Sequence, residues 1–255
     1  MNDVAQTIAS ARLNGEKLHA YPCDYPVSPE DAYTLQNAVT AALNDEIAGW
    51  KIGCTSAAAQ QALNAAGPFF GPVLKSRRFE SGAELKLVDT DLAIVEAEVA
   101  LVLASDLPPK QEAYSLEEIQ SAIASVCPTF ELVNRRLPGD IAEGGVHWAV
   151  VDGGLNDALV VGAGITDLPM EALPHLEVSL QINGVTVSNG LGGNALGGAH
   201  KALQWLADEF SQKGRTLHAG QIVSTGLTTE IVTATPGDTF EAIISRLGTV
   251  KAVFI

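Results

Sequence analysis

The chain has 255 residues, 47% of them hydrophobic, and a formal net charge of −15 from 30 acidic and 15 basic side chains. This composition is typical of a folded globular protein, and the length allows one large domain or a domain with a smaller extension. The acidic charge argues against nucleic acid and anionic membranes as partners, because both require a basic surface.

The sequence contains no membrane-spanning or secretory signal. No apolar run approaches the roughly 18 residues that span a bilayer. The first residues, Met-Asn-Asp-Val-Ala, lack the basic and apolar regions of a signal peptide. Three cysteines, Cys23, Cys54 and Cys127, form no Cys-x-x-Cys pair, which favours reduced thiols over disulfides or a zinc site. We therefore expect a cytoplasmic protein.

The first part of the chain is predicted to be helical. Its second helix is marked by Ser28 as N-cap, Pro29 at the first helical position, and Glu30 and Asp31 in the first turn. No chemical motif occurs here. We expect residues 1–48 to form an N-terminal helical subdomain.

A short strand follows at residues 49–53 and contains Lys51 between Trp50 and Ile52. A lysine without water around it can transfer a proton or hold a substrate carboxylate. The alternative is a surface lysine whose ammonium group reaches water. A helix over residues 57–66, capped by Thr55 or Ser56, is expected next.

Further along, a helix is predicted over about 116–126. It starts with the capping box of Ser115 and Glu118. Pro128 is expected to stop this helix, and residues 129–133 then read as a short strand.

The second half is predicted to be mostly β-structure. Alternating apolar residues on both sides of Asn183-Gly184 indicate a hairpin. A helix over residues 199–212 and three or four short strands over 221–255 follow. Helices first, then long β stretches with few helices between them, favour an α+β fold with a β-rich core.

The strongest chemical signal lies in residues 93–103, an aliphatic strand that carries Glu96 and Glu98. Residues i and i+2 of a strand point to the same face. Two buried carboxylates repel each other, so one must bind a proton or both must share a cation.

Glu131, in the strand predicted at 129–133, adds a third acid among apolar neighbours. Three carboxylates would form an all-oxygen site, which favours Mg²⁺ or Mn²⁺ over Zn²⁺. The alternative is that Glu96 and Glu98 lie on the solvated face of an edge strand, and that Glu131 pairs with Arg135 or Arg136.

Other catalytic and nucleotide-binding motifs are missing from the sequence. The glycine-rich stretch 188–198 matches neither the dinucleotide-binding fingerprint nor a Walker loop. No Gly-x-Ser-x-Gly elbow supports a serine hydrolase.

Taken together, the motifs resemble the fumarylacetoacetate hydrolase superfamily, in its branch of 2-keto-4-pentenoate hydratases and 4-oxalocrotonate decarboxylases. They occur in the family's order and cover nearly the whole chain. The matching segments are residues 49–56, 70–74, 95–100, 130–136, 151–153, 196–197, 205–207 and 220–226.

The resemblance implies a mixed β-sandwich roll, with residues 49–255 as the catalytic domain, and a homo-oligomer. It implies Mg²⁺ or Mn²⁺ bound by Glu96, Glu98 and Glu131, with Lys51 as the catalytic residue beside the substrate. The substrate-binding positions that it implies are Thr55, Gly71, Leu74, Arg136 and Thr225.

The implied substrate is a small anionic 2-oxo or 2-hydroxydienoic acid, and the implied reaction is hydration. The alternatives are decarboxylation of the 4-oxalocrotonate type, C–C hydrolysis of an acylpyruvate, and a non-catalytic member of the superfamily. The chain departs from the family where residues meet the substrate: an acidic residue is usual near 74–78, which here read Leu-Lys-Ser-Arg-Arg. Further departures are Asn134, Gly153, Leu227 and the pair Gly198-Ala199.

Overall fold

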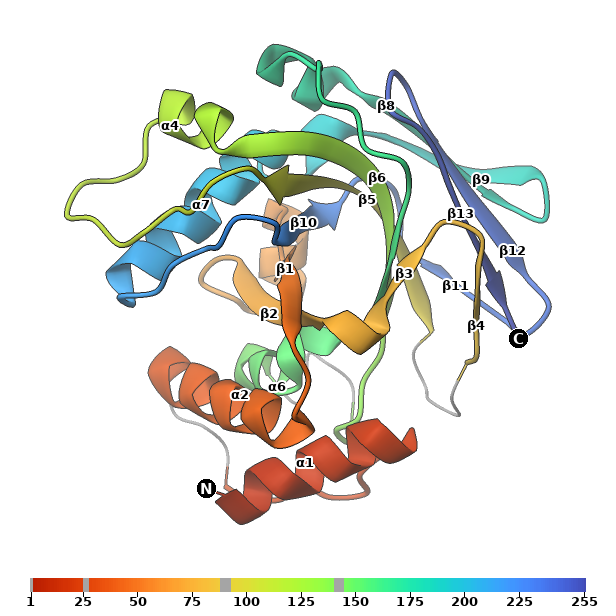
Figure 1. Ribbon diagram of the computed structural model, residues 1–255. Coiled ribbons are helices and arrows are strands. Elements are labelled where there is room, and N and C mark those ends of the chain that lie inside the picture. Colours follow the sequence, from red (N-terminus) through yellow and green to blue (C-terminus); the bar gives the residue numbers. More distant parts are fainter. Residues whose placement is uncertain (1, 25–27, 88–92, 140–144) are drawn as a thin grey trace.

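The computed structural model describes residues 2–24, 28–87, 93–139 and 145–255 (Figure 1). Its strands are Ile47–Gly53 (β1), Phe69–Leu74 (β2), Arg78–Glu80 (β3), Ala83–Leu85 (β4), Ile94–Leu103 (β5), Ile123–Val133 (β6), Asn156–Val161 (β7), Glu177–Ile182 (β8), Val185–Leu191 (β9), Ile222–Leu227 (β10), Val232–Thr233 (β11), Thr239–Ile244 (β12) and Gly248–Phe254 (β13). Its α-helices are Asn2–Asn14 (α1), Pro29–Leu43 (α2), Ala57–Ala62 (α3), Leu116–Ser121 (α4), Val146–Val151 (α6) and Ala199–Gln212 (α7). Short 3₁₀ turns cover Lys75–Arg77 (η1), Gly153–Leu155 (η2), Met170–His175 (η3) and Gly192–Asn194 (η4).

The strands form two mixed sheets. The larger sheet has the order β2-β1-β10-β5-β6-β7-β3, with β11 beside β5, and the smaller has the order β4-β13-β12-β8-β9. Most neighbours are antiparallel, but β1 runs parallel to β10, β3 parallel to β7 and β4 parallel to β13. The predicted α+β class with a β-rich core is confirmed.

Strand β5 lies in the middle of the larger sheet, between β10 and β6. It pairs with β6 along its whole length, in the register that sets Glu96 opposite Glu131. A central strand has no solvated edge. The alternative that Glu96 and Glu98 line an exposed edge strand is therefore wrong.

The main hydrophobic core lies between the two sheets and under α7. The rings of Phe130 on β6 and Phe240 on β12 meet edge to face with centroids 6.2 Å apart. On α7, Phe210 meets Trp50 of β1 in the same manner at 4.9 Å. The predicted hairpin at Asn183-Gly184 is present, and both residues have positive φ, as its turn requires.

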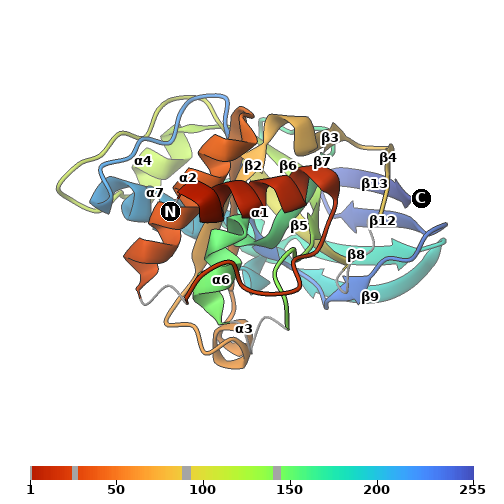
Figure 2. The same cartoon turned by 90° about the horizontal axis from the view of Figure 1, so that it is seen from below.

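The helices α1, α2 and α6 pack together on one side of the larger sheet (Figure 2). The side chain of Ser28 caps α2 as predicted. The apolar cluster around these helices also contains Trp148 of α6 and Leu137, so residues outside 1–48 share the core of the N-terminal helices. The division at residue 48 stays a prediction. Among the described residues, no helix is long and apolar enough to cross a membrane.

The helix predicted over residues 116–126 is shorter in the structure. The capping box of Ser115 and Glu118 is formed, but α4 ends at Ser121 and β6 begins at Ile123. Pro128 does not stop a helix; it lies inside β6 opposite Val99. The β-branched residues after α4 satisfy their backbone groups on β5 instead of continuing the helix.

The helix predicted over residues 57–66 is also shorter, and α3 ends at Ala62. Its cap is Ser56, whose side chain accepts a hydrogen bond from the backbone N–H of Ala59. Thr55 therefore does not cap α3. Its side chain lies beside Gly226 instead.

Candidate metal centre

Three glutamates from two neighbouring strands meet on one face of the larger sheet. Glu96 and Glu98 project from β5 and Glu131 projects from β6. One carboxylate oxygen of each lies within 4.8 Å of the others. Glu98 and Glu131 are fully buried, whereas Glu96 is partly exposed. The site therefore meets solvent on the side of Glu96.

One oxygen of Glu98 is held by the neighbouring strand β10. Its Oε2 accepts hydrogen bonds from the hydroxyl of Ser224 at 2.5 Å and from the backbone N–H of Gly226 at 3.0 Å. Its Oε1 is buried and has no hydrogen-bond partner. A buried carboxylate oxygen without a partner is strongly unfavourable unless a cation binds it.

Glu131 shows the same arrangement. Its Oε1 accepts a hydrogen bond from the amide of Asn156 at 3.0 Å and lies 3.2 Å from the ammonium of Lys51. Its Oε2 is buried and unpartnered. The alternative in which Glu131 pairs with Arg135 or Arg136 is not observed, because Lys51 occupies that role.

The electrostatics of the cluster favour binding of a proton or a cation. Burial raises the pKa of Glu98 well above its usual value, and the charges of Glu131 and Glu96 raise it further. Burial likewise raises the pKa of Glu131 to about 7. Burial opposes the charged form of Lys51, but the three glutamates outweigh it and raise the pKa of the ammonium. A single lysine leaves two of the three carboxylate charges uncompensated.

A divalent cation fits these residues. Two buried carboxylates each offer an oxygen that the protein leaves unpartnered, and Glu96 offers a third from the open side. The donors are all oxygens, which suits Mg²⁺ or Mn²⁺, and three protein ligands leave positions for water and substrate. Protein donors on the opposite oxygens fix the orientation of two ligands, as outer-shell groups do in metal sites.

An irregularity in β10 positions the groups that hold Glu98. The pairing with β5 shifts between Ser224 and Leu227, and this shift turns the N–H of Gly226 toward Glu98. Thr225, a predicted substrate-binding residue, donates its hydroxyl to the carbonyl of Val99. A Cβ on Gly226 would lie 2.2 Å from Oγ1 of Thr55. Thr55 therefore lies beside a residue that binds Glu98, and contact of Thr55 or Thr225 with substrate stays a prediction.

Gly71 lets the turn η2 approach Lys51. It pairs with Lys51 across β1 and β2, and a Cβ at this position would lie 2.0 Å from the carbonyl oxygen of Gly153. The next carbonyl, that of Gly154, accepts a hydrogen bond from Lys51 at 3.1 Å. Gly71 thus lies near the centre, and its close packing explains why a side chain is missing there.

The other two predicted substrate-binding residues lie away from the three glutamates. Leu74 is at the far end of β2 and packs in the apolar cluster of the N-terminal helices. The guanidinium of Arg136 is buried and donates to Asp152, to the carbonyl of Asn156 and to Asp157. Through these contacts, Arg136 stabilises the chain around η2. A direct contact of either residue with substrate stays a prediction.

Sequence reasoning did not identify Ser224 and Asn156 as partners of the glutamates. Ser224 lies within a segment that matches a family motif, but its partner is 126 residues away in the chain. Asn156 follows the motif at 151–153 and reaches Glu131 only because β7 pairs with β6.

A curled mixed sheet with a buried cluster of three carboxylates and a lysine defines a class of metal-dependent enzymes. Residues 80–255 match the family model described as the fumarylacetoacetate (FAA) hydrolase C-terminal domain. The chain belongs to this family, as the motifs predicted, and the expected fold is confirmed.

Several relatives match almost the whole chain. A 2-keto-4-pentenoate hydratase of Paraburkholderia xenovorans (strain LB400) is 30% identical, over 99% of this chain and 94% of the relative. A 2-oxo-hept-4-ene-1,7-dioate hydratase of Escherichia coli is 27% identical, over 99% and 97%. Among solved structures, the 4-oxalocrotonate decarboxylase of Pseudomonas putida G7 has a TM-score of 0.88 at 25% identity, over 100% of this chain and 96% of that chain. That enzyme has been solved with calcium and acetate and with magnesium and adipate.

Proposed function

We propose that the protein is a divalent-metal-dependent lyase that hydrates an unsaturated 2-oxo acid of the 2-keto-4-pentenoate type. The observation that carries the proposal is the pair of unpartnered oxygens on buried Glu98 and Glu131, beside the ammonium of Lys51. The hydratases among the relatives support the reaction class.

Glu96, Glu98 and Glu131 would hold Mg²⁺ or Mn²⁺. When bound, the cation would act as a Lewis acid toward the carboxylate and 2-oxygen of the substrate. The substrate enters past Glu96, the partly exposed member of the three. Because the whole chain carries a charge of −15, local cationic groups must attract the anionic acid at this point.

Lys51 is the group of this chain that moves a proton. Its ammonium has two described acceptors, Oε1 of Glu131 and the carbonyl of Gly154, which leaves a third N–H for the substrate. In hydration, the dienol loses its O–H proton and gains a proton at carbon, so that its 2-oxygen becomes a carbonyl. The H and OH of water then add across the remaining conjugated C=C bond. Lys51 delivers the proton to carbon, and Glu131 and Gly154 keep its Nζ in place.

Decarboxylation is the second candidate, favoured by the likeness to the 4-oxalocrotonate decarboxylase over the full chain. Loss of CO₂ from the distal carboxylate, which is conjugated with the 2-oxo group, leaves a dienolate. Lys51 would be the proton donor to this dienolate. The two reactions differ in the fate of water, which adds to the product only in hydration.

The test is a panel of two substrates with Mg²⁺. We expect the dienol absorbance of 2-hydroxypenta-2,4-dienoate to disappear with wild-type protein, without CO₂ release. The Lys51→Met variant should bind Mg²⁺ normally and lose about 100-fold or more in turnover. Lys75→Met, which changes an exposed lysine paired with Glu46, is the matched control and should be fully active.

CO₂ release from 4-oxalocrotonate with no reaction of the dienoate would favour the decarboxylase. Full activity of Lys51→Met would remove Lys51 from the mechanism. We also propose, from the family resemblance, that the enzyme works in the cytoplasm as a homo-oligomer. Size-exclusion chromatography with light scattering tests the assembly.

A further inference from the structure

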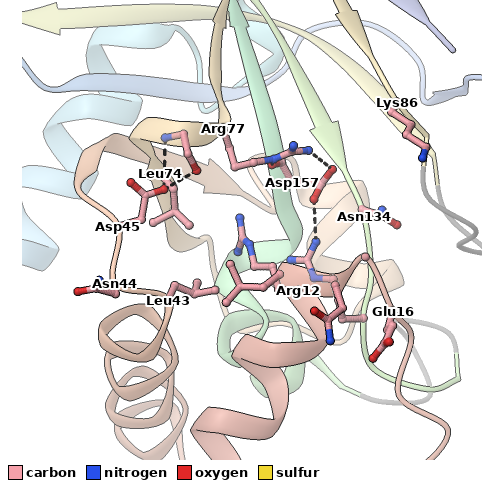
Figure 3. A pocket seen from close by; sticks show the side chains of 15 residues that line it. Arg12, Glu16, Leu43, Asn44, Asp45, Leu74, Arg77, Lys86, Asn134 and Asp157 are labelled. Carbon is pink, nitrogen blue, oxygen red and sulfur yellow. Dashed lines mark hydrogen bonds and ion pairs between the residues drawn. The ribbon is translucent and has the colours of Figure 1, made fainter.

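A hollow lies on the side of the N-terminal helices, away from the metal centre. Its volume is about 490 Å³, which is in the range of sites for small metabolites. We call it the helix-side hollow, defined by the following residues that line it: Arg12, Leu43, Leu74, Arg77, Lys86 and Asp157 (Figure 3).

The hollow and the metal centre lie on opposite faces of the same strand. Asn156 and Asp157 begin β7. Asn156 donates to Glu131 in the metal centre, whereas Asp157 lines the hollow and binds Arg77 at 2.8 Å. Neighbouring residues of a strand point to opposite faces. The hollow is not lined by Lys51 or by any of the three glutamates.

Three acidic side chains in and behind the hollow are already occupied, whereas a fourth, Glu16, lines the hollow and is exposed. Asp157 binds both Arg77 and Arg136, and Asp152 binds Arg136. Asp45 accepts hydrogen bonds from the hydroxyl and backbone N–H of Ser76. These carboxylates form no direct ion pair with Arg12.

Arg12 lines the hollow with a guanidinium group that pairs with none of these carboxylates. Its Nη2 is buried and has no hydrogen-bond partner, and Figure 3 shows its side chain among those that surround the hollow. Burial, followed by the charge of Arg136, lowers the pKa of Arg12 to about 10, so the guanidinium stays charged at neutral pH. A buried charged donor without a partner is unfavourable, and an anion from solution would relieve it.

We propose that the helix-side hollow binds a small aliphatic carboxylate on Arg12, at a site separate from the metal centre. The planar guanidinium matches a carboxylate with two parallel hydrogen bonds. Leu13, Leu43 and Leu74 line the hollow as well and would contact an aliphatic body. Lys86 is exposed at this hollow and is available to a second carboxylate. This site is additional to the proposed enzymatic function and does not depend on it.

Titration calorimetry with glutarate tests the proposal. The protein is stripped of metal and dialysed into buffer without chelator, because chelators are themselves carboxylates. We expect one molecule of glutarate per chain. Arg12→Met should weaken this binding about tenfold or more, the loss expected for one charge-assisted interaction. Lys51→Met, which changes the metal centre, should bind glutarate like the wild type.

A second variant covers the case in which Arg12→Met fails to fold. Leu13 is 67% exposed and lines the hollow, so Leu13→Glu places a negative charge there without disturbing the core. It should weaken glutarate binding. Leu116→Glu, at a position 40% exposed on α4, is the matched control and should have no effect.

Four results would overturn the proposal. The first is no binding of glutarate at 10 mM, a concentration about ten times a millimolar Kd. The second is unchanged affinity in both Arg12→Met and Leu13→Glu. The third is loss of binding in Lys51→Met, which would place glutarate at the metal centre. Inorganic phosphate is the comparison anion, and tighter binding of phosphate than of glutarate would overturn the carboxylate assignment.

Discussion

The Glu98→Gln substitution separates metal binding from folding. A glutamine at this position keeps an oxygen that can accept from Ser224 and Gly226, which now hold Oε2 of Glu98. Its amide N–H₂ then replaces the unpartnered Oε1. Changing an outer-shell partner of a metal ligand typically lowers affinity 10–100-fold. Replacing the anionic ligand itself by a donor group should have a larger effect, so we expect Mg²⁺ affinity to fall roughly 100-fold or more.

The same substitution should not destabilise the metal-free protein. It removes a buried carboxylate whose pKa is raised by burial and by the charges of Glu131 and Glu96, so repulsion falls. Mg²⁺ at 100 times its Kd adds about 2.7 kcal/mol to the stability of a protein that binds it. At about 2–4 °C per kcal/mol for a chain of this size, wild type should gain roughly 5–10 °C in Tm. Glu98→Gln, with a Kd roughly 100-fold higher, should gain about 1 °C or less at the same Mg²⁺ concentration.

Calorimetric titration of Mg²⁺ and thermal melts with and without Mg²⁺ measure both effects. Glu177→Gln changes an exposed acid on β8 and is the matched control, with wild-type affinity and the full Tm shift. The metal assignment would be refuted if Glu98→Gln bound Mg²⁺ as tightly as wild type. A large drop in the metal-free Tm would refute the argument that the carboxylates repel one another.

Three further predictions follow from the same contacts. Ser224→Ala removes a hydrogen bond to a metal ligand and should weaken Mg²⁺ binding about tenfold in calorimetry while turnover at saturating Mg²⁺ falls less. Gly71→Ala forces a Cβ to within 2.0 Å of a carbonyl oxygen and should lower the free energy of unfolding by about 2–3 kcal/mol in urea melts, whereas Gly67→Ala, in open space, should be neutral. Glu131 has a folded-state pKa of about 7, raised above 4.5, so the folded state binds the extra proton and metal-free protein should lose stability as pH rises from about 4.5 to 7. Melts over this range should show that fall in wild type and a smaller fall in Glu131→Gln, where Glu98 is the remaining fully buried glutamate with a raised pKa.

The metal ligands could be predicted because their signal is local. Two acids spaced by two residues in an aliphatic segment, followed by a third in another apolar segment, require a shared cation or proton whatever the rest of the fold is. The groups that hold these ligands could not be predicted. Ser224 and Asn156 are ordinary polar residues in the sequence, and only strand pairing brings them to Glu98 and Glu131.

The fold was predicted best where a local rule decides it. The N-cap at Ser28, the hairpin at Asn183-Gly184 and the amphipathic α7 all follow from local chemistry. The end of α4 could not be predicted from the local sequence, because residues after Ser121 have both a helical apolar spacing and a β-branched composition. Pairing with β5 decides between the two, and that information lies outside the segment.

The site and the curl of the larger sheet depend on each other. Lys51 is on β1 and Glu131 is on β6, with β10 and β5 between them. In a flat sheet three strand spacings would separate these two positions by about 14 Å. Nζ of Lys51 nevertheless lies 3.2 Å from Oε1 of Glu131, so the sheet must curl until the faces of β1 and β6 converge (Figure 1). A sheet of the same strand order without that curl would keep all three glutamates together but would separate the proton donor from them. Metal binding therefore needs only the β5–β6 pair with its immediate neighbours, whereas the proposed catalysis needs the whole curved sheet.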